Sequence, residues 1–180
     1  MAVQEVLKMG HPILRQVALP VTEFNTPALD NLILDMKDTM VAYNGAGLAA
    51  PQIGASLRVM IFGIAENSRY PEAETIEETI LINPEFDILD ESTEEGWEGC
   101  LSVPGLRGLV PRYQKIRYRG YDKMGKLVEK EVENFHARVF QHEYDHLNGV
   151  LYPQRITDMT NFTFETELPY YIATKASPND

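Results

Sequence analysis

His142-Glu143-Tyr144-Asp145-His146 is the stretch of sequence from which the fold can be built outward. Positions i and i+4 of a helix lie one above the other, so both imidazoles can bind one cation while Glu143 reaches a water molecule on that cation. The alternative is a polar helix face with two ordinary histidines. Since the chain has 4 histidines in all, two of them at this spacing around a glutamate favour a metal site.

The residues around this stretch predict the helix that carries it. Asn134 is expected as its N-cap and Gly149 as its C′ residue. Between them, one stripe is formed by Phe135, Val139, His142 and His146.

A second amphipathic helix is predicted for residues 27–43. Thr26 and Pro27 form a typical helix start, an N-cap oxygen followed by a residue without an N–H. The apolar residues that repeat at helical spacing are Leu29, Leu32, Ile33, Met36 and Met40.

Strands are expected at residues 57–64 and 79–82, with an exposed loop at 66–78 between them. Residues 115–121 and 127–132 flank the turn residues 122–125 and predict a hairpin. The fold class is therefore α+β.

Length and composition limit the remaining possibilities. A chain of 180 residues with 44% hydrophobic content suits a single domain, residues 1–180, in which we expect about 168–180 to be a loose tail. The net charge of -11 disfavours extensive nucleic-acid binding. No apolar run approaches the ~20 residues that span a bilayer, and we expect neither a membrane segment nor an export signal. A single cysteine suits a reducing compartment, so the cytoplasm is the expected location.

Two histidines are too few for a catalytic cation, which normally has three protein ligands. The sequence after His146 has no histidine, and its acidic residues are not in a typical ligand setting. Cys100 is the other obvious donor, although a lone cysteine is more often a small buried apolar residue.

Three segments together resemble the signature motifs of peptide deformylases, in the family's order. They are residues 45–54 (GAGLAAPQIG), 98–102 (EGCLS) and 141–146 (QHEYDH). Supporting similarity extends from Val6 to about Arg155, whereas the last two dozen residues do not match the family's C-terminal helix.

The resemblance implies antiparallel or mixed sheets packed around a central metal-binding helix. It also implies a metal-dependent hydrolase that removes the formyl group from the N-terminal formyl-methionine of nascent polypeptides and releases formate. Its metal ligands would be Cys100, His142 and His146. The cation would be Fe²⁺ physiologically, with Zn²⁺, Ni²⁺ or Co²⁺ as possible substitutes, and its bound water would be the nucleophile.

The same resemblance assigns roles to residues around the metal. Glu143 would act as general base and acid, and the Gln52 amide and the Leu101 backbone N–H would stabilise the oxyanion. Substrate-binding positions would be Gly47, Gly99 and Val139. Glu98 and Arg112 would form a pair that orients the loop around Cys100, unless they are an ordinary surface ion pair.

Two other functions remain open at this point. A zinc endopeptidase would take its third ligand from downstream and be indifferent to Cys100→Ala. A structural zinc module would have four protein ligands and be indifferent to Glu143→Ala. For a deformylase we expect nascent peptides as partners, transient contact with the ribosome, no nucleic-acid specificity, and a bacterial rather than organellar source.

Overall fold

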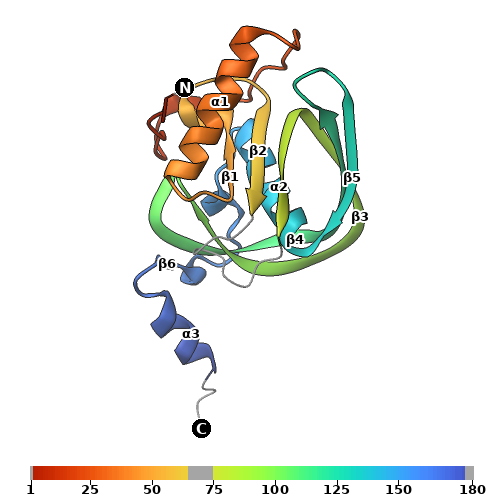
Figure 1. Cartoon of the computed structure of the whole chain (residues 1–180). Helices are drawn as coiled ribbons and strands as arrows, with labels where there is room; N and C mark the ends of the chain where they lie inside the picture. Colours follow the sequence, from red (N-terminus) through yellow and green to blue (C-terminus); the bar gives the residue numbers. More distant parts are fainter. Residues whose placement is uncertain (1, 65–74, 177–180) are drawn as a thin grey trace.

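The computed structural model describes residues 2–64 and 75–176, and its strands form one antiparallel sheet (Figure 1). The sheet has 6 strands in the order β1-β2-β3-β4-β5, and β6 pairs with β4. This confirms the α+β class. The elements, in chain order, are η1 (Pro12–Arg15), α1 (Pro27–Ala42), β1 (Gly47–Ala49), η2 (Ala50–Ile53), β2 (Val59–Ile64), β3 (Ile76–Cys100), β4 (Val103–Tyr121), β5 (Leu127–Glu133), α2 (Asn134–Leu147), η3 (Tyr152–Arg155), η4 (Met159–Asn161), β6 (Phe162–Phe164) and α3 (Leu168–Ala176).

Helix α1 begins as its sequence predicts. The Thr26 side chain accepts a hydrogen bond from the backbone N–H of Leu29 at 3.2 Å, which satisfies one of the helix's free donors. Its apolar stripe packs on β1 and β2, so the helix covers one face of the sheet. The buried residues of α1 are Leu29, Ile33, Met36, Thr39 and Met40.

The first two predicted strands are present, but the loop between them is shorter than predicted. Residues 66–74 of that loop lie outside the described residues. Residues 76–78 already belong to β3, so that part of the prediction was wrong. The reason is Ile76, which is 3% exposed and pairs with Ile64 of β2, so its burial extends the strand toward the loop.

Strands β3 and β4 form a long curved ribbon (Figure 1). Their register shifts at several places, and such irregularities bend a strand pair. β3 ends at Cys100, which pairs with Val103 across a tight turn. The predicted hairpin is confirmed, with Tyr121 of β4 opposite Leu127 of β5.

Helix α2 packs against β1, β2, β4 and β5. Phe140 stacks on Tyr118 of β4 with ring centroids 4.8 Å apart. Gly149 follows the helix with φ +71, as expected for a C′ glycine. The predicted N-cap was wrong: Asn134 is the first helical residue, with φ +54, and the cap position is Glu133, which makes no side-chain capping bond.

The C-terminal segment differs from the expected loose tail. Residues 168–176 form helix α3, which leads away from the sheet on the side of β6 (Figure 1). Residues 177–180 of that prediction lie outside the described residues. None of the helices described is both long enough and apolar enough to cross a membrane.

Candidate metal centre

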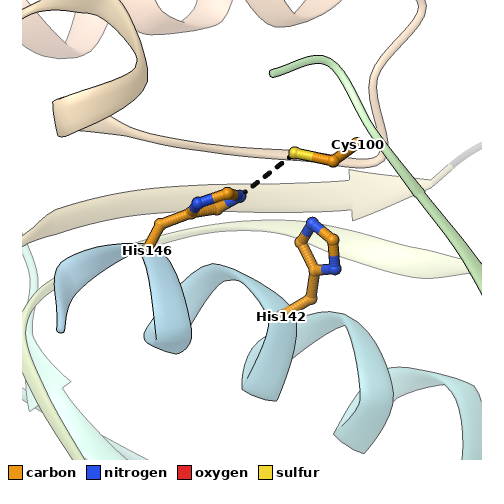
Figure 2. A group of neighbouring side chains, drawn as sticks. All are labelled: Cys100, His142 and His146. Carbon is orange, nitrogen blue, oxygen red and sulfur yellow. Dashed lines mark hydrogen bonds between the residues drawn. The ribbon is translucent and has the colours of Figure 1, made fainter. Parts of the chain in front are cut away.

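A thiol and two imidazoles meet between the end of β3 and the C-terminal half of α2 (Figure 2). One ligand atom from each of Cys100, His142 and His146 lies within 4.8 Å of the others. The Sγ of Cys100 is 3.3 Å from Nε2 of His146, and both side chains are buried. Residues separated by 46 positions in the chain are therefore brought together as the sequence predicts.

The turn after β3 and the segment η2 hold the sulfur in place. The backbone N–H of Ser102 donates to Cys100 Sγ at 3.4 Å, and Gln52 Nε2 lies 3.5 Å from the same sulfur. Gln52 is itself fixed, because its Oε1 accepts from the N–H of Ala49 at 2.8 Å while its Nε2 donates to Ser102 Oγ at 3.1 Å. Its amide nitrogen therefore faces the centre.

Glu98 orients the ring of His142. Its Oε2 lies 2.8 Å from Nδ1 of His142, so an ionised Glu98 accepts the Nδ1 proton and leaves Nε2 free to bind a cation. Burial by itself raises the pKa of Glu98, but the charge of Arg112 and the hydrogen bond with His142 outweigh burial and hold the pKa well below its usual value.

A buried ionic network supports Glu98 from behind. Arg112 donates to both oxygens of Glu98, at 2.9 and 3.0 Å, and to Asp145 at 2.6 Å. Arg138 adds a bond to Glu98 at 3.0 Å, and Arg155 donates to Asp145 at 2.7 and 3.1 Å. Since Arg112 and Glu98 are 6% and 3% exposed, their pair is buried, not a surface ion pair.

The sequence predicted only the Glu98 and Arg112 part of this network. A signal for Arg138 was available, because it stands one helical turn before His142 on the same face of α2. Asp145 lies inside the predicted motif, but nothing local showed that it would pair with arginines from β4 and η3.

Glu143 lies beside the three donors with a free oxygen. It is 4% exposed, and its Oε2 has no hydrogen-bond partner among the described atoms. Burial raises the pKa of Glu143 to about 7. Gly47 makes room for this carboxylate, because a Cβ at Gly47 would lie 2.3 Å from Glu143 Oε1.

These donors fit a divalent transition-metal ion. Burial raises the pKa of the Cys100 thiol, but the neighbouring His146 and His142 outweigh burial and lower it well below its usual value. A thiolate with two imidazoles is a donor set that zinc and iron accept, and three protein ligands is the number found in catalytic sites. The unpartnered Glu143 oxygen is placed where it can accept a proton from water at such a site.

The position of Cys100 and the number of donors also argue against a zinc endopeptidase and a structural zinc module. Cys100 lies before α2 in the chain, whereas a zinc endopeptidase of this type takes its third ligand from after the helix. In residues 2–64 and 75–176 the group has three members, not the four of a structural zinc module.

A cavity opens beside the centre and contains most of the predicted site residues. Glu98, predicted as part of the orienting pair, also lines it, and five lining residues were not predicted as site residues, namely Gly45, Ala46, Trp97, Phe135 and Arg138. The predicted residues that line it are Gly47, Gln52, Gly99, Cys100, Leu101, Val139, His142 and Glu143.

Comparison with known proteins gives a consistent result. Residues 3–162 match the family model for polypeptide deformylase. The chain is 57% identical to peptide deformylase 1 of Nitrosomonas europaea over 92% of this chain and 94% of that protein. It is 52% identical to peptide deformylase 1 of Prochlorococcus marinus, over 93% of this chain and 88% of the relative.

Solved structures agree with the sequence matches. A Met-Ala-Ser-bound class I type b peptide deformylase from Acinetobacter baumannii has a TM-score of 0.83 and 41% identity, covering 86% of this chain and 99% of that one. The peptide deformylase of Thermotoga maritima has a TM-score of 0.79 and 39% identity, covering 88% and 100%. The chain thus belongs to the polypeptide deformylase family, metal-dependent hydrolases that remove the formyl group from the N-terminus of proteins.

Proposed function

We propose that the chain removes the formyl group from N-terminal formyl-methionine with the residues of this centre, and that Cys100, His142 and His146 hold the metal. One observation carries the proposal: a thiol and two imidazoles lie within 4.8 Å of one another beside a buried carboxylate oxygen that has no partner. The carboxylate belongs to Glu143.

A divalent cation, when bound, acidifies its water and polarises a carbonyl oxygen. Glu143 accepts the proton of the attacking water and returns it to the departing amine, so formate and a free amino terminus result. Burial, which raises the pKa of Glu143, favours this exchange, because an acid-base group works best when its pKa lies near the working pH.

Negative charge develops on the formyl oxygen as water adds to the carbon. Gln52 supplies one donor, since its amide nitrogen is turned toward the centre by the bonds to Ala49 and Ser102. The backbone N–H of Leu101 supplies a second donor. Loss of one such donor typically raises the barrier by ~3 kcal/mol.

The substrate's methionine side chain lies against Val139 and Phe135, which are one turn apart on α2 and line the cavity. The backbones at Gly47 and Gly99 contact the peptide. At both positions a Cβ would collide with a neighbour, Glu143 or Arg107, so glycine keeps the wall close to the substrate. The Acinetobacter relative was crystallised with Met-Ala-Ser, a peptide that begins with methionine.

The cation is Fe²⁺ in the cell, and Zn²⁺, Ni²⁺ or Co²⁺ substitute for it, because this donor set does not select among these ions by affinity alone. The chain acts in the cytoplasm as a single domain on nascent peptides, with transient contact to the ribosome. A net charge of -11 supports contacts that do not involve extended nucleic acid.

The test is formate release from formyl-Met-Ala-Ser under anaerobic conditions with Fe²⁺, for the wild type and for Glu143→Gln. The variant is expected to lose about 10²–10⁴-fold in kcat/KM while it retains the metal, since the carboxylate is not a ligand. A variant that keeps full activity, or a wild type that releases no formate, contradicts the proposal.

A further inference from the structure

Trp97 lies between two hollows of the protein. On one side it lines the cavity that contains Cys100 and Glu143. On the other side it lines a shallow surface groove together with Leu109 of β4 and Tyr171 of α3. Its ring therefore connects the candidate active site with the C-terminal helix.

The contact with α3 has a defined geometry. The rings of Trp97 and Tyr171 meet edge to face, with centroids 5.3 Å apart and planes at 81°. The Tyr171 hydroxyl donates to Asn161, which ties the ring to the segment before β6.

Helix α3 has no role in the chemistry described above. It lies beyond residues 3–162, the part of the chain that matches the family model. Its contact with a residue of the cavity wall therefore suggests a role in substrate choice.

The position of Trp97 indicates which part of the substrate it meets. Val139, Cys100 and Glu143 are 7%, 5% and 4% exposed, so they form the buried inner end of the cavity. Trp97 is partly exposed and borders the outer groove, so it lies at the rim. If the formyl group is at the metal and the methionine lies on Val139, the rim meets the residue that follows methionine.

We propose that Trp97 is a specificity-determining residue that favours an apolar side chain after the substrate's methionine, and that Tyr171 positions its ring. This inference rests on the proposed deformylase function. An aromatic wall gains much more apolar contact area with a leucine side chain than with the small, polar hydroxymethyl group of serine. A preference of about three- to tenfold in kcat/KM for Leu over Ser is expected at that substrate position.

The test compares formyl-Met-Leu-Ser with formyl-Met-Ser-Ser in the metal-loaded enzyme. Tyr171→Ala should reduce the preference for Leu toward one and leave kcat/KM for the Ser peptide unchanged. The matched control is Tyr170→Ala on the same helix, because Tyr170 is 71% exposed. Tyr171→Phe keeps the ring contact and should keep the preference.

A second readout does not depend on activity. Trp97 is the only tryptophan of the chain, so emission excited at wavelengths where tyrosine does not absorb reports on this ring alone. The product peptide Met-Leu-Ser should change the emission of the wild type, and Tyr171→Ala should shift the emission of the free enzyme to the red, whereas Tyr170→Ala should not.

The outcomes separate this inference from the proposed function. A wild type that releases formate equally fast from both peptides overturns the roles of Trp97 and Tyr171 but not the proposed function. Equal preferences in the wild type and Tyr171→Ala, or equal emission, overturn the role of Tyr171. A wild type that releases formate from neither peptide overturns the proposed function itself.

Discussion

Gly47→Ala should inactivate the enzyme by displacing the general base. The new Cβ would lie 2.3 Å from Oε1 of Glu143, 2.7 Å from Cδ and 2.8 Å from Cγ. Non-bonded heavy atoms rest at about 3.5 Å, so the carboxylate has to move by roughly 1 Å. Gly47 is not among the positive-φ residues, so the backbone itself accepts alanine.

The expected loss of activity follows from the general acid-base catalysis that a displaced Glu143 can no longer provide. A shift of about 1 Å in a reacting group can cost 10²-fold, and complete loss of general acid-base catalysis costs about 10²–10⁴-fold. We therefore expect kcat/KM for formyl-Met-Ala-Ser to fall by about 10²–10⁴-fold. Metal content should stay the same, because Glu143 is not one of the three metal donors.

Two controls make the reasoning refutable. Gly45→Ala on the same loop places its Cβ 3.2 Å from Leu101 and should have a much smaller effect. Adding Gly47→Ala to Glu143→Gln should cost little further activity, because both changes act on one group. If the double variant lost a further ~10²-fold or more in kcat/KM relative to Glu143→Gln alone, Gly47→Ala would be blocking the substrate instead of displacing Glu143.

Three further predictions concern buried charges. Arg112→Met should lower the free energy of unfolding by about 3–5 kcal/mol, because the buried Glu98 and Asp145 each lose one of their charged partners. Arg119→Met on the surface should cost under ~1 kcal/mol, and equal losses in urea denaturation would contradict this. Burial raises the pKa of Glu143 to about 7 and a bound cation lowers it again, so kcat/KM should fall on the acid side between pH ~4.5 and 7, and a flat pH–rate profile over that range would contradict the assignment of the base. Burial lowers the pKa of His136 to about 4, so the unfolded chain takes up this proton first as the pH falls. The wild type should lose ~1.6 kcal/mol between pH 6.5 and pH 5 from this group. His136→Gln should lack that part of the loss, as measured by unfolding at both pH values, and an equal loss in the variant would contradict this.

The parts of the fold that could be predicted are those specified by local sequence. The Thr26 cap, the apolar stripe of α1 and the glycine after α2 act within one or two helical turns, and all three are present. The approach of His142 and His146 was also predictable, because these two residues need only a helix to come together, whereas Cys100 followed only from the family resemblance.

Residues 79–82 and 115–121 were predicted as strands, but the rest of the long β3–β4 ribbon could not be read from its sequence. Its outer part is held by charges that pair across strands, for example Arg119 with Glu85 at 3.1 Å and with Asp87 at 3.3 Å. These side chains are exposed, so they show no apolar alternation. The same limit applies to the site: Arg138 and Trp97 contact partners far away in the sequence, and only the folded chain brings them together.

The central claim is that one sulfur and two imidazole nitrogens bind a single cation. X-ray absorption at the metal edge of the zinc-loaded protein measures this directly. The account predicts one Zn–S distance of about 2.3 Å and Zn–N distances of about 2.0–2.1 Å, with the sulfur contribution lost in Cys100→Ser. A spectrum of the wild type without sulfur, or an identical spectrum for the variant, would contradict it.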